Sequence, residues 1–306
     1  METVTLALWA ANLGRPLAGL DEWLGIVETR IGEAERAGAD LLVLPEWIAS
    51  HWLSFAPKDL PADREVAWMA QHAQAALDGL SRRLAGRRPT LLAGTMPVAE
   101  DGGFVNRAHL LTPDGCSVHQ DKLCLTPFET DPAAWLLQPG RSLTVIAWRA
   151  LRLAVNVCLD IKQPALAARL QGLDLDLVLV PSMTDFESGY RRVFGCARAR
   201  AVELMAPVAA VGTIGTQHIK GRREPNTSAA AVYLPCEVEL GSTGVHAEIP
   251  MLTEANDDGP MLVARDVPVG HCRRLRRVGA EAWPGPWDAA AVTLRHVRLD
   301  GAGHDH

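Results

Sequence analysis

The sequence predicts an α/β fold of four layers, an α-β-β-α sandwich in which two mixed sheets pack together with helices outside. Apolar strands alternate with amphipathic helices along the chain. A strand–helix–strand–helix pattern followed by adjacent strands occurs once in each half, which suits two similar sheets. No low-complexity linker separates the halves, so residues 1–306 are expected to form one domain, with a core over about 3–265 and a C-terminal extension over about 266–306.

In the first half, residues 3–11 are the first expected strand, and residues 17–37 form an amphipathic helix with its apolar side chains on one face. Gly38 can adopt the left-handed conformation that ends a helix. Residues 41–44 are wholly apolar, as expected of a strand covered on both faces. The remaining predictions here are a helix over 63–84, a strand over 90–96, a hairpin of 104–111 with 116–122, and an irregular Pro-rich loop over 126–140.

The second half repeats the pattern. Two strands are expected first, over residues 143–148 and 151–157, and then a helix over 164–170. The apolar strand 175–180 and a long helix over 190–205 follow. The strands that complete the set are predicted at residues 208–212, 227–234 and 261–265.

Composition narrows the functional classes. A net charge of −6 over 306 residues argues against a nucleic-acid partner, and the basic cluster at 271–277 is interpreted as a solvated face or a subunit contact. No apolar run approaches the length of a membrane span, and the N-terminus lacks the charged region of a signal peptide. The six cysteines form no CxxC pair, which fits reduced thiols in the cytoplasm. We therefore expect a cytoplasmic protein without a membrane or nucleic-acid partner.

Cys158 is the first candidate for chemistry. It follows the buried strand 151–157, and Asp160 and Pro164 then indicate a turn and a helical start. Ligands bind at such strand ends in open α/β sheets, and a helix N-terminus would favour the thiolate. A free cysteine is also a common buried small apolar residue, so this position alone does not establish a nucleophile.

Two more polar residues stand at strand ends. Glu46 closes the strand 41–44, and Lys122 closes the hairpin strand 116–122. Separately, the first could be a solvated acid and the second a charge on a sheet edge. Together with Cys158, they supply the acid, base and thiol that acyl transfer requires.

The residues also resemble a known family, the nitrilase-like carbon–nitrogen hydrolases, and within it the amidase-type branch. The similarity extends over about residues 3–265, in the order in which the family's motifs occur. The stretches that carry the resemblance are residues 39–46, 112–115 followed by 121–122, 155–160, 176–182 and 198–203.

The resemblance implies a catalytic Glu–Lys–Cys triad at Glu46, Lys122 and Cys158. The family's additional glutamate corresponds to Glu129, although the glycine that usually precedes it is missing here. The Lys122 ammonium and the backbone N–H of Leu159 would then stabilise an oxyanion.

The segments that would border the substrate depart from the family pattern. After Ser182 the chain continues with Met183 and Thr184 and lacks the tryptophan that the family often has in this segment. After Pro164 it has Ala165 where the family commonly has a glutamate. From its place beside Glu46, Trp47 could form an aromatic wall of the pocket, although tryptophan is more often core or surface packing.

The expected reaction is hydrolysis of a non-peptide C–N bond in a small amide, through a thioester on the cysteine and with release of ammonia or an amine. The resemblance implies no metal or organic cofactor, and a homodimer or higher homo-oligomer that uses the helix 190–205. The alternatives are hydrolysis of a nitrile or an N-carbamoyl group on the same triad, acyl transfer to another nucleophile, and a lapsed enzyme that acts as a binding protein.

Overall fold

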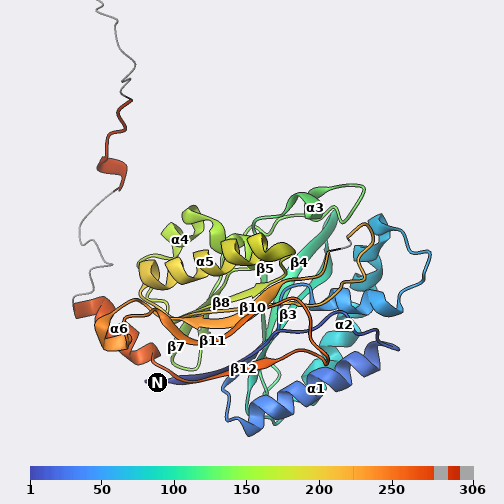
Figure 1. The fold of residues 1–306 in the computed structure, drawn as a ribbon, viewed down its shortest axis with the longest axis horizontal. Helices are drawn as coiled ribbons and strands as arrows, with labels where there is room; N and C mark the ends of the chain where they lie inside the picture. The colour runs from blue at the N-terminus through green and yellow to red at the C-terminus, as the bar shows by residue number, and fades with distance from the viewer. Residues whose placement is uncertain (223, 279–288, 297–306) are drawn as a thin grey trace, which may run out of the picture.

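The protein is described here by a computed structural model, covering residues 1–222, 224–278 and 289–296. The described residues form two six-stranded mixed sheets with helices around them, which confirms the predicted sandwich (Figure 1). The first sheet has the spatial order β12 (Met261–Val267), β1 (Val4–Trp9), β2 (Leu41–Val43), β3 (Thr90–Glu100), β4 (Gly103–Leu111) and β5 (Ser117–Asp121). The second has the order β11 (Val245–Leu252), β10 (Ser228–Tyr233), β9 (Val208–Gly212), β8 (Leu177–Ser182), β7 (Leu151–Val155) and β6 (Val145–Trp148).

Each sheet has a parallel centre and antiparallel flanks. Strands β1, β2 and β3 are parallel in the first sheet, and β7, β8 and β9 are parallel in the second. The pairs at the flanks, such as β3 with β4 and β9 with β10, are antiparallel. Parallel neighbours need long crossovers, which explains why the helices lie between these strands in the sequence.

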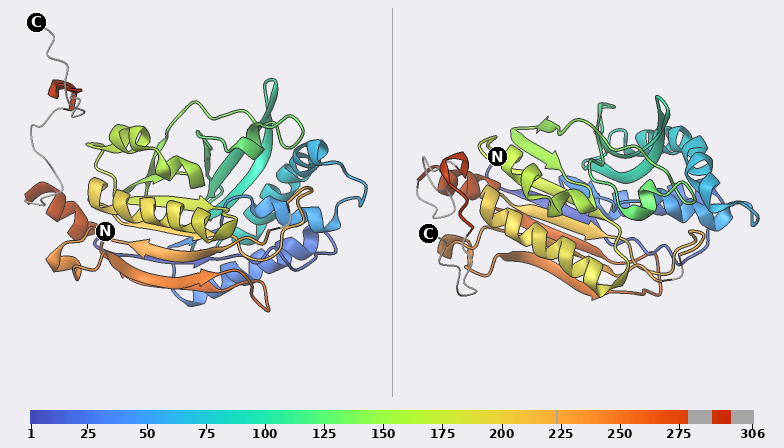
Figure 2. Two further views of the ribbon diagram at one scale, coloured as in Figure 1. Left: turned by 45° about the horizontal axis from the view of Figure 1, so that its top comes forward. Right: turned by 90° about the horizontal axis from the view of Figure 1, so that it is seen from above.

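The helices cover the outer faces of the two sheets (Figures 1 and 2). On the first sheet lie α1 (Leu20–Arg36) and α2 (Glu65–Leu84), and on the second α4 (Pro164–Leu170) and α5 (Phe186–Leu204). Each long helix buries one apolar face, which for α1 includes Trp23, Val27 and Ile31. No helix in the described ranges is long and apolar enough to cross a membrane.

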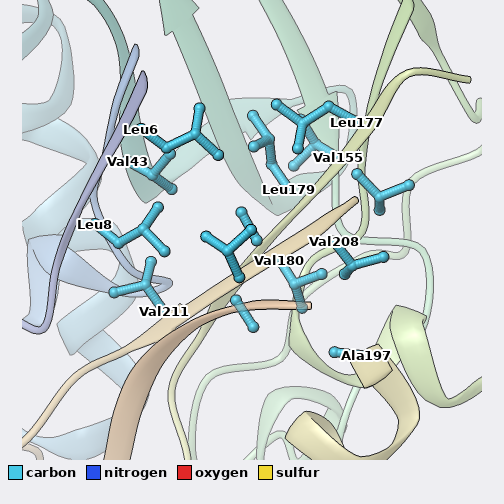
Figure 3. Packing of buried hydrophobic residues seen from close by; sticks show 14 of the residues in the cluster. Leu6, Leu8, Val43, Val155, Leu177, Leu179, Val180, Ala197, Val208 and Val211 are labelled. Carbon is cyan, nitrogen blue, oxygen red and sulfur yellow. The ribbon is translucent and has the colours of Figure 1, made fainter. Parts of the chain in front are cut away.

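The core lies between the sheets. Leu6 and Leu8 of β1 and Val43 of β2 approach Leu179 and Val180 of β8 in Figure 3. All five side chains have no exposed surface. Removing this much apolar surface from water fixes the two sheets relative to each other and therefore fixes the strand ends that carry the candidate site.

Strand β11 and helix α6 (Val269–Val278) were not predicted. Strand β11 was missed because it is a partly exposed edge strand that contains Pro250, a residue tolerated only at such edges. Helix α6 was missed because arginines interrupt its apolar positions. Several predictions were inexact. Strand β3 extends to Glu100 rather than to residue 96, α5 begins at Phe186 rather than at residue 190, and the loop 126–140 contains the short helix α3 (Pro127–Thr130).

The basic cluster at 271–277 lies on α6, where two of its arginines bind groups of this same chain. Arg273 pairs with Asp176 at 2.8 Å, and Arg274 pairs with Glu2 at 2.5 Å. In Figure 1 the helix lies beside the N-terminus. Arg274 remains 59% exposed, as expected of a solvated face, and a subunit contact through this cluster stays a prediction. The remainder of the extension, 279–288 and 297–306, lies outside the described residues.

Candidate active site

The structure brings the four predicted catalytic side chains together. Glu46 follows β2, Lys122 follows β5, Glu129 lies on α3, and Cys158 begins the short 3₁₀ helix η3 (Cys158–Lys162). Their exposed fractions are 1%, 1%, 2% and 6%. Ionisable groups buried this deeply require partners, and the partners are largely one another.

Lys122 holds the two glutamates in one network. Its Nζ donates to Glu46 Oε1 at 2.7 Å and to Glu129 Oε2 at 2.6 Å. Such short charge-assisted bonds fix the ammonium group between the two carboxylates.

Asn106 is a member of this network that the sequence analysis missed. The side chain has no exposed surface, and its Nδ2 donates to Glu46 Oε1 at 3.1 Å and to Glu129 Oε1 at 3.3 Å. The backbone carbonyl of Asn106 accepts from the backbone N–H of Lys122 at 2.8 Å. A single amide inside the apolar strand β4 carries no sequence signal that separates it from an ordinary buried polar residue.

Glu129 is fixed from a second side by the start of α3. The backbone N–H of Thr126 donates to Glu129 Oε2 at 2.9 Å, and the indole of Trp47 donates to Glu129 Oε1 at 3.0 Å. Thr126 and Glu129 form a capping box, whose Thr-x-x-Glu pattern is visible in the sequence and would have predicted this helix start.

The two carboxylates have different acid strengths. Burial raises the pKa of Glu46, and the neighbouring Glu129 raises it further, against the opposing effect of Lys122. Burial also disfavours the ionised form of Glu129, but Lys122 and the donors around it lower the pKa of that carboxyl below its usual value. For Lys122, burial opposes the charge, yet the two glutamates raise its pKa. The network therefore keeps Glu129 as the ionised partner and makes Glu46 the stronger base.

Cys158 adopts a left-handed backbone conformation with φ of 48°, at the turn from β7 into η3. Its Sγ lies 3.6 Å from the carbonyl oxygen of Met183, whose N–H donates to Glu46 Oε2 at 2.9 Å. Burial raises the pKa of the thiol, and Glu46 raises it further. Lys122 acts in the opposite direction and lowers the pKa of the thiol, and the expected effect of the helix start on the thiolate stays a prediction.

Asp160 connects the cysteine turn to the lysine strand. Its carboxylate accepts from the N–H of Val157 at 3.1 Å and from the N–H of Cys124 at 2.7 Å. A further N–H, that of Leu123, lies 3.2 Å from the same carboxylate. Burial raises the pKa of Asp160 to about 6, against the effect of these donors. One buried carboxylate thus ties the residue before Cys158 to the two residues after Lys122.

A cavity of about 400 Å³ opens beside these groups. Trp47, Leu159, Met183 and Thr184, all predicted near the substrate, line it. The Thr184 hydroxyl donates to the carbonyl of Thr227 at 2.6 Å and so is engaged with the main chain. Other residues of the lining are Phe128, Trp135, Lys162, Asp185, Arg192 and Arg222.

The structure contains no group of three or more His, Cys, Asp or Glu residues that could hold a metal ion within residues 1–222, 224–278 and 289–296. The candidate site thus consists of a thiol, two carboxylates and an ammonium group. Such a set can perform nucleophilic attack and proton transfer.

Comparison with known proteins gives consistent results. The sequence profile of the carbon-nitrogen hydrolase family matches residues 7–247. A probable hydrolase of Bacillus subtilis is 25% identical over 265 residues, covering 87% of this chain and 50% of that protein, so the chain spans half of that relative's length. An omega-amidase of Yersinia enterocolitica is 26% identical over 216 residues, covering 70% of this chain and 76% of that protein.

The fold has close structural counterparts. A substituted form of an amidase from Nesterenkonia, described as a member of the nitrilase superfamily, superimposes with a TM-score of 0.67. The alignment covers 89% of this chain and 95% of that chain at 21% identity. At this identity the likeness concerns the fold.

Proposed function

The chain belongs to the carbon–nitrogen hydrolase family, and we propose that it hydrolyses the C–N bond of a small non-peptide amide with Cys158 as nucleophile. The observation that carries the proposal is the buried Glu46–Lys122–Glu129 network beside this thiol, at the wall of the cavity. Amidases among the relatives favour an amide over a nitrile or an N-carbamoyl substrate.

In the first half of the reaction, Glu46 removes the thiol proton as the sulfur attacks the amide carbon. Its raised pKa suits this role, because a stronger base takes the proton of a weakly acidic thiol more readily. The carbonyl oxygen becomes an oxyanion, which Lys122 and the N–H of Leu159 would stabilise. Glu46 then returns its proton to the departing nitrogen, and the C–N bond breaks to leave a thioester on Cys158.

In the second half, Glu46 removes a proton from water, and the resulting hydroxide attacks the thioester carbon. The carbon–sulfur bond breaks, the acid product leaves, and the sulfur recovers its proton from Glu46. Glu129 does not exchange protons in this scheme. With a lowered pKa it stays ionised and keeps Lys122 charged and in position.

The test is ammonia release from a panel of small amides, nitriles and N-carbamoyl compounds. We expect turnover of amides by the native protein, and Cys158→Ala should abolish it while the circular dichroism spectrum stays native. Cys272→Ala is the matched control, because Cys272 is also buried but lies on α6 and outside the cavity lining. Near-normal amide turnover by Cys158→Ala would refute the proposal.

A further inference from the structure

The cavity beside Cys158 has an excess of positive charge, although the chain as a whole has a net charge of −6. Its acidic lining residues are Glu46, Glu129 and Asp185. Its cationic lining residues are Lys122, Lys162, Arg192 and Arg222. Lys122 is already bound by the two glutamates, which leaves one acidic lining residue, Asp185, for the other three cations, and Asp185 pairs with Arg222. Positive charge is therefore concentrated in the part of the cavity that the catalytic network does not occupy.

Of the three cations outside the catalytic network, Arg222 has the most contacts that hold it in place. Its guanidinium forms an ion pair with Asp185 and lies over the ring of Phe128, with 4.9 Å from Cζ to the ring centroid. Asp185 also accepts from the side-chain amide of Gln217 at 3.3 Å, which holds the acid in place. Only 21% of the Arg222 side chain is exposed. A planar cation fixed in this way is prepared to bind a second acceptor without a large loss of side-chain freedom.

Burial lowers the pKa of Arg222, whereas Glu129, Glu46 and Cys158 raise it. The guanidinium lines the same cavity as Glu46, Glu129 and Cys158. A group bound to Arg222 would belong to the same molecule that Cys158 attacks.

Lys162 and Arg192 add two further charges to the lining. Lys162 ends η3 and Arg192 lies near the start of α5, and these two elements pack against each other. Within the described part of the chain, neither side chain has an ion-pair partner. Cations on two adjacent elements thus face the cavity without protein anions to balance them.

We propose that the substrate carries a carboxylate at the end away from the scissile amide, and that Arg222, supported by Lys162 and Arg192, binds it. This inference rests on the proposed amide hydrolysis at Cys158. The guanidinium fork matches a carboxylate in shape and charge, and a small amide with one carboxylate fits a cavity of about 400 Å³. The excess positive charge would also attract an anionic substrate from solution.

The test compares two amides that differ only at the far end. Succinamate has a carboxylate where butyramide has a methyl group. Calorimetry on the Cys158→Ala protein measures their binding without turnover, and we expect succinamate to bind at least about tenfold more tightly, as one charged hydrogen-bonding contact would provide. Raising the salt concentration should weaken succinamate binding and leave butyramide binding nearly constant.

Variants then identify the residue responsible. In the Cys158→Ala background, Arg222→Met should lower the ratio of succinamate to butyramide affinity about 10- to 100-fold. Arg222→Lys should have an intermediate effect, because it keeps a charge and loses the fork. Arg191→Met is the control. This side chain is 68% exposed, is paired with Glu187 and lies outside the cavity lining, so the ratio should not change.

Equal binding of the two amides would overturn the inference. So would an Arg222→Met protein in which both affinities fall together, since that result would mean that Arg222 only braces Asp185. Turnover by the native protein is measured separately. If butyramide and succinamate bind as expected and neither is cleaved, the proposed hydrolysis is wrong while the carboxylate site stands.

Discussion

At the level of single residues, the chemistry depends on two carboxylates that share one ammonium group. Glu46 and Glu129 both bind Lys122, yet the pKa of Glu46 is raised and that of Glu129 is lowered. Burial disfavours the ionised form of both, but the neighbouring Glu129 also raises the pKa of Glu46, whereas Thr126 and Trp47 lower that of Glu129. Environment alone thus suits one glutamate to move protons and the other to remain charged.

Asp160 gives the first prediction. Asp160→Asn places an amide NH₂ against backbone donors, so we expect a loss of about 1–3 kcal/mol in stability and a fall in kcat, because the turns that carry Lys122 and Cys158 separate. Urea unfolding and steady-state kinetics measure the two effects.

Asp176→Asn is the matched control for this prediction. Asp176 is also buried and also accepts from a backbone N–H, that of Arg152, but it lies outside the cavity lining. The Asp176→Asn protein should lose a comparable free energy of unfolding and keep the kcat of the native protein. Equal effects of both substitutions on kcat would show that Asp160 has no positioning role.

At the level of elements, the site is made by strand ends, and this is why much of it could be predicted. Glu46 and Cys158 follow apolar strands and Lys122 follows the hairpin strand β5, and these signals are local in the sequence. Asn106 and Arg222 could not be found in this way. The first lies inside a strand and the second in the loop before β10, and only the folded chain brings them to the site.

The helices also show which elements a local sequence pattern can predict and which it cannot. The long amphipathic helix α1 was predicted because its periodicity extends over many turns. The four-residue helix α3 is too short to show such periodicity. In α6, arginines stand between the apolar residues, and two of them bind the distant acids Asp176 and Glu2. Those partners are remote in sequence, so no local pattern identifies them.

Gly94 provides a prediction at this scale. It lies in β3 with φ of 67°, and a Cβ there would approach the carbonyl oxygen of Pro45, next to Glu46, to 2.2 Å. Gly94→Ala should therefore cost more than the about 1–2 kcal/mol of a left-handed backbone alone, and it should also reduce activity by moving Pro45.

The control for Gly94 is Gly86→Ala. Gly86 has nearly the same φ, 71°, and nothing within 4 Å of the added Cβ. Thermal or urea unfolding of both variants separates the clash from the backbone strain. Equal losses of stability would contradict the account of the close contact at Pro45.

At the level of the whole molecule, two buried histidines connect stability to pH. Burial lowers the pKa of His51 and of His109 to about 4 each, from an ordinary value of 6.5. Between these values the unfolded chain binds more protons than the folded one, so the free energy of unfolding falls as the pH is lowered from 6.5 towards 4. When the pH is lowered from 7 to 5, each of the two histidines should reduce the free energy of unfolding by about 2 kcal/mol.

His109→Gln tests this linkage. In this variant the free energy of unfolding, measured with urea, should fall by about 2 kcal/mol less between pH 7 and pH 5 than in the native protein, because one titrating group has been removed. His119→Gln is the control, because His119 is an exposed neighbour on β5. An unchanged pH dependence in His109→Gln would show that this histidine does not contribute.

The assembly of the molecule is a separate prediction. The outer face of α5 exposes Gly195, Arg198 and Ala199, and we propose that this face contacts a second copy of the chain in a homodimer. Light scattering should then give about twice the 33.0 kDa mass of one chain. A mass of one chain at micromolar concentration would contradict the dimer.

The central claim is that the amide carbon is transferred to the sulfur of Cys158. The most direct measurement mixes the protein with an amide that it cleaves, quenches the reaction in acid within the first turnover, and locates the acyl group by peptide mass spectrometry. The account predicts a hydroxylamine-sensitive acyl adduct on the peptide that contains Cys158 and none on the peptides of the other five cysteines. Amide consumed without any adduct on Cys158, or with the adduct on another cysteine, would contradict it.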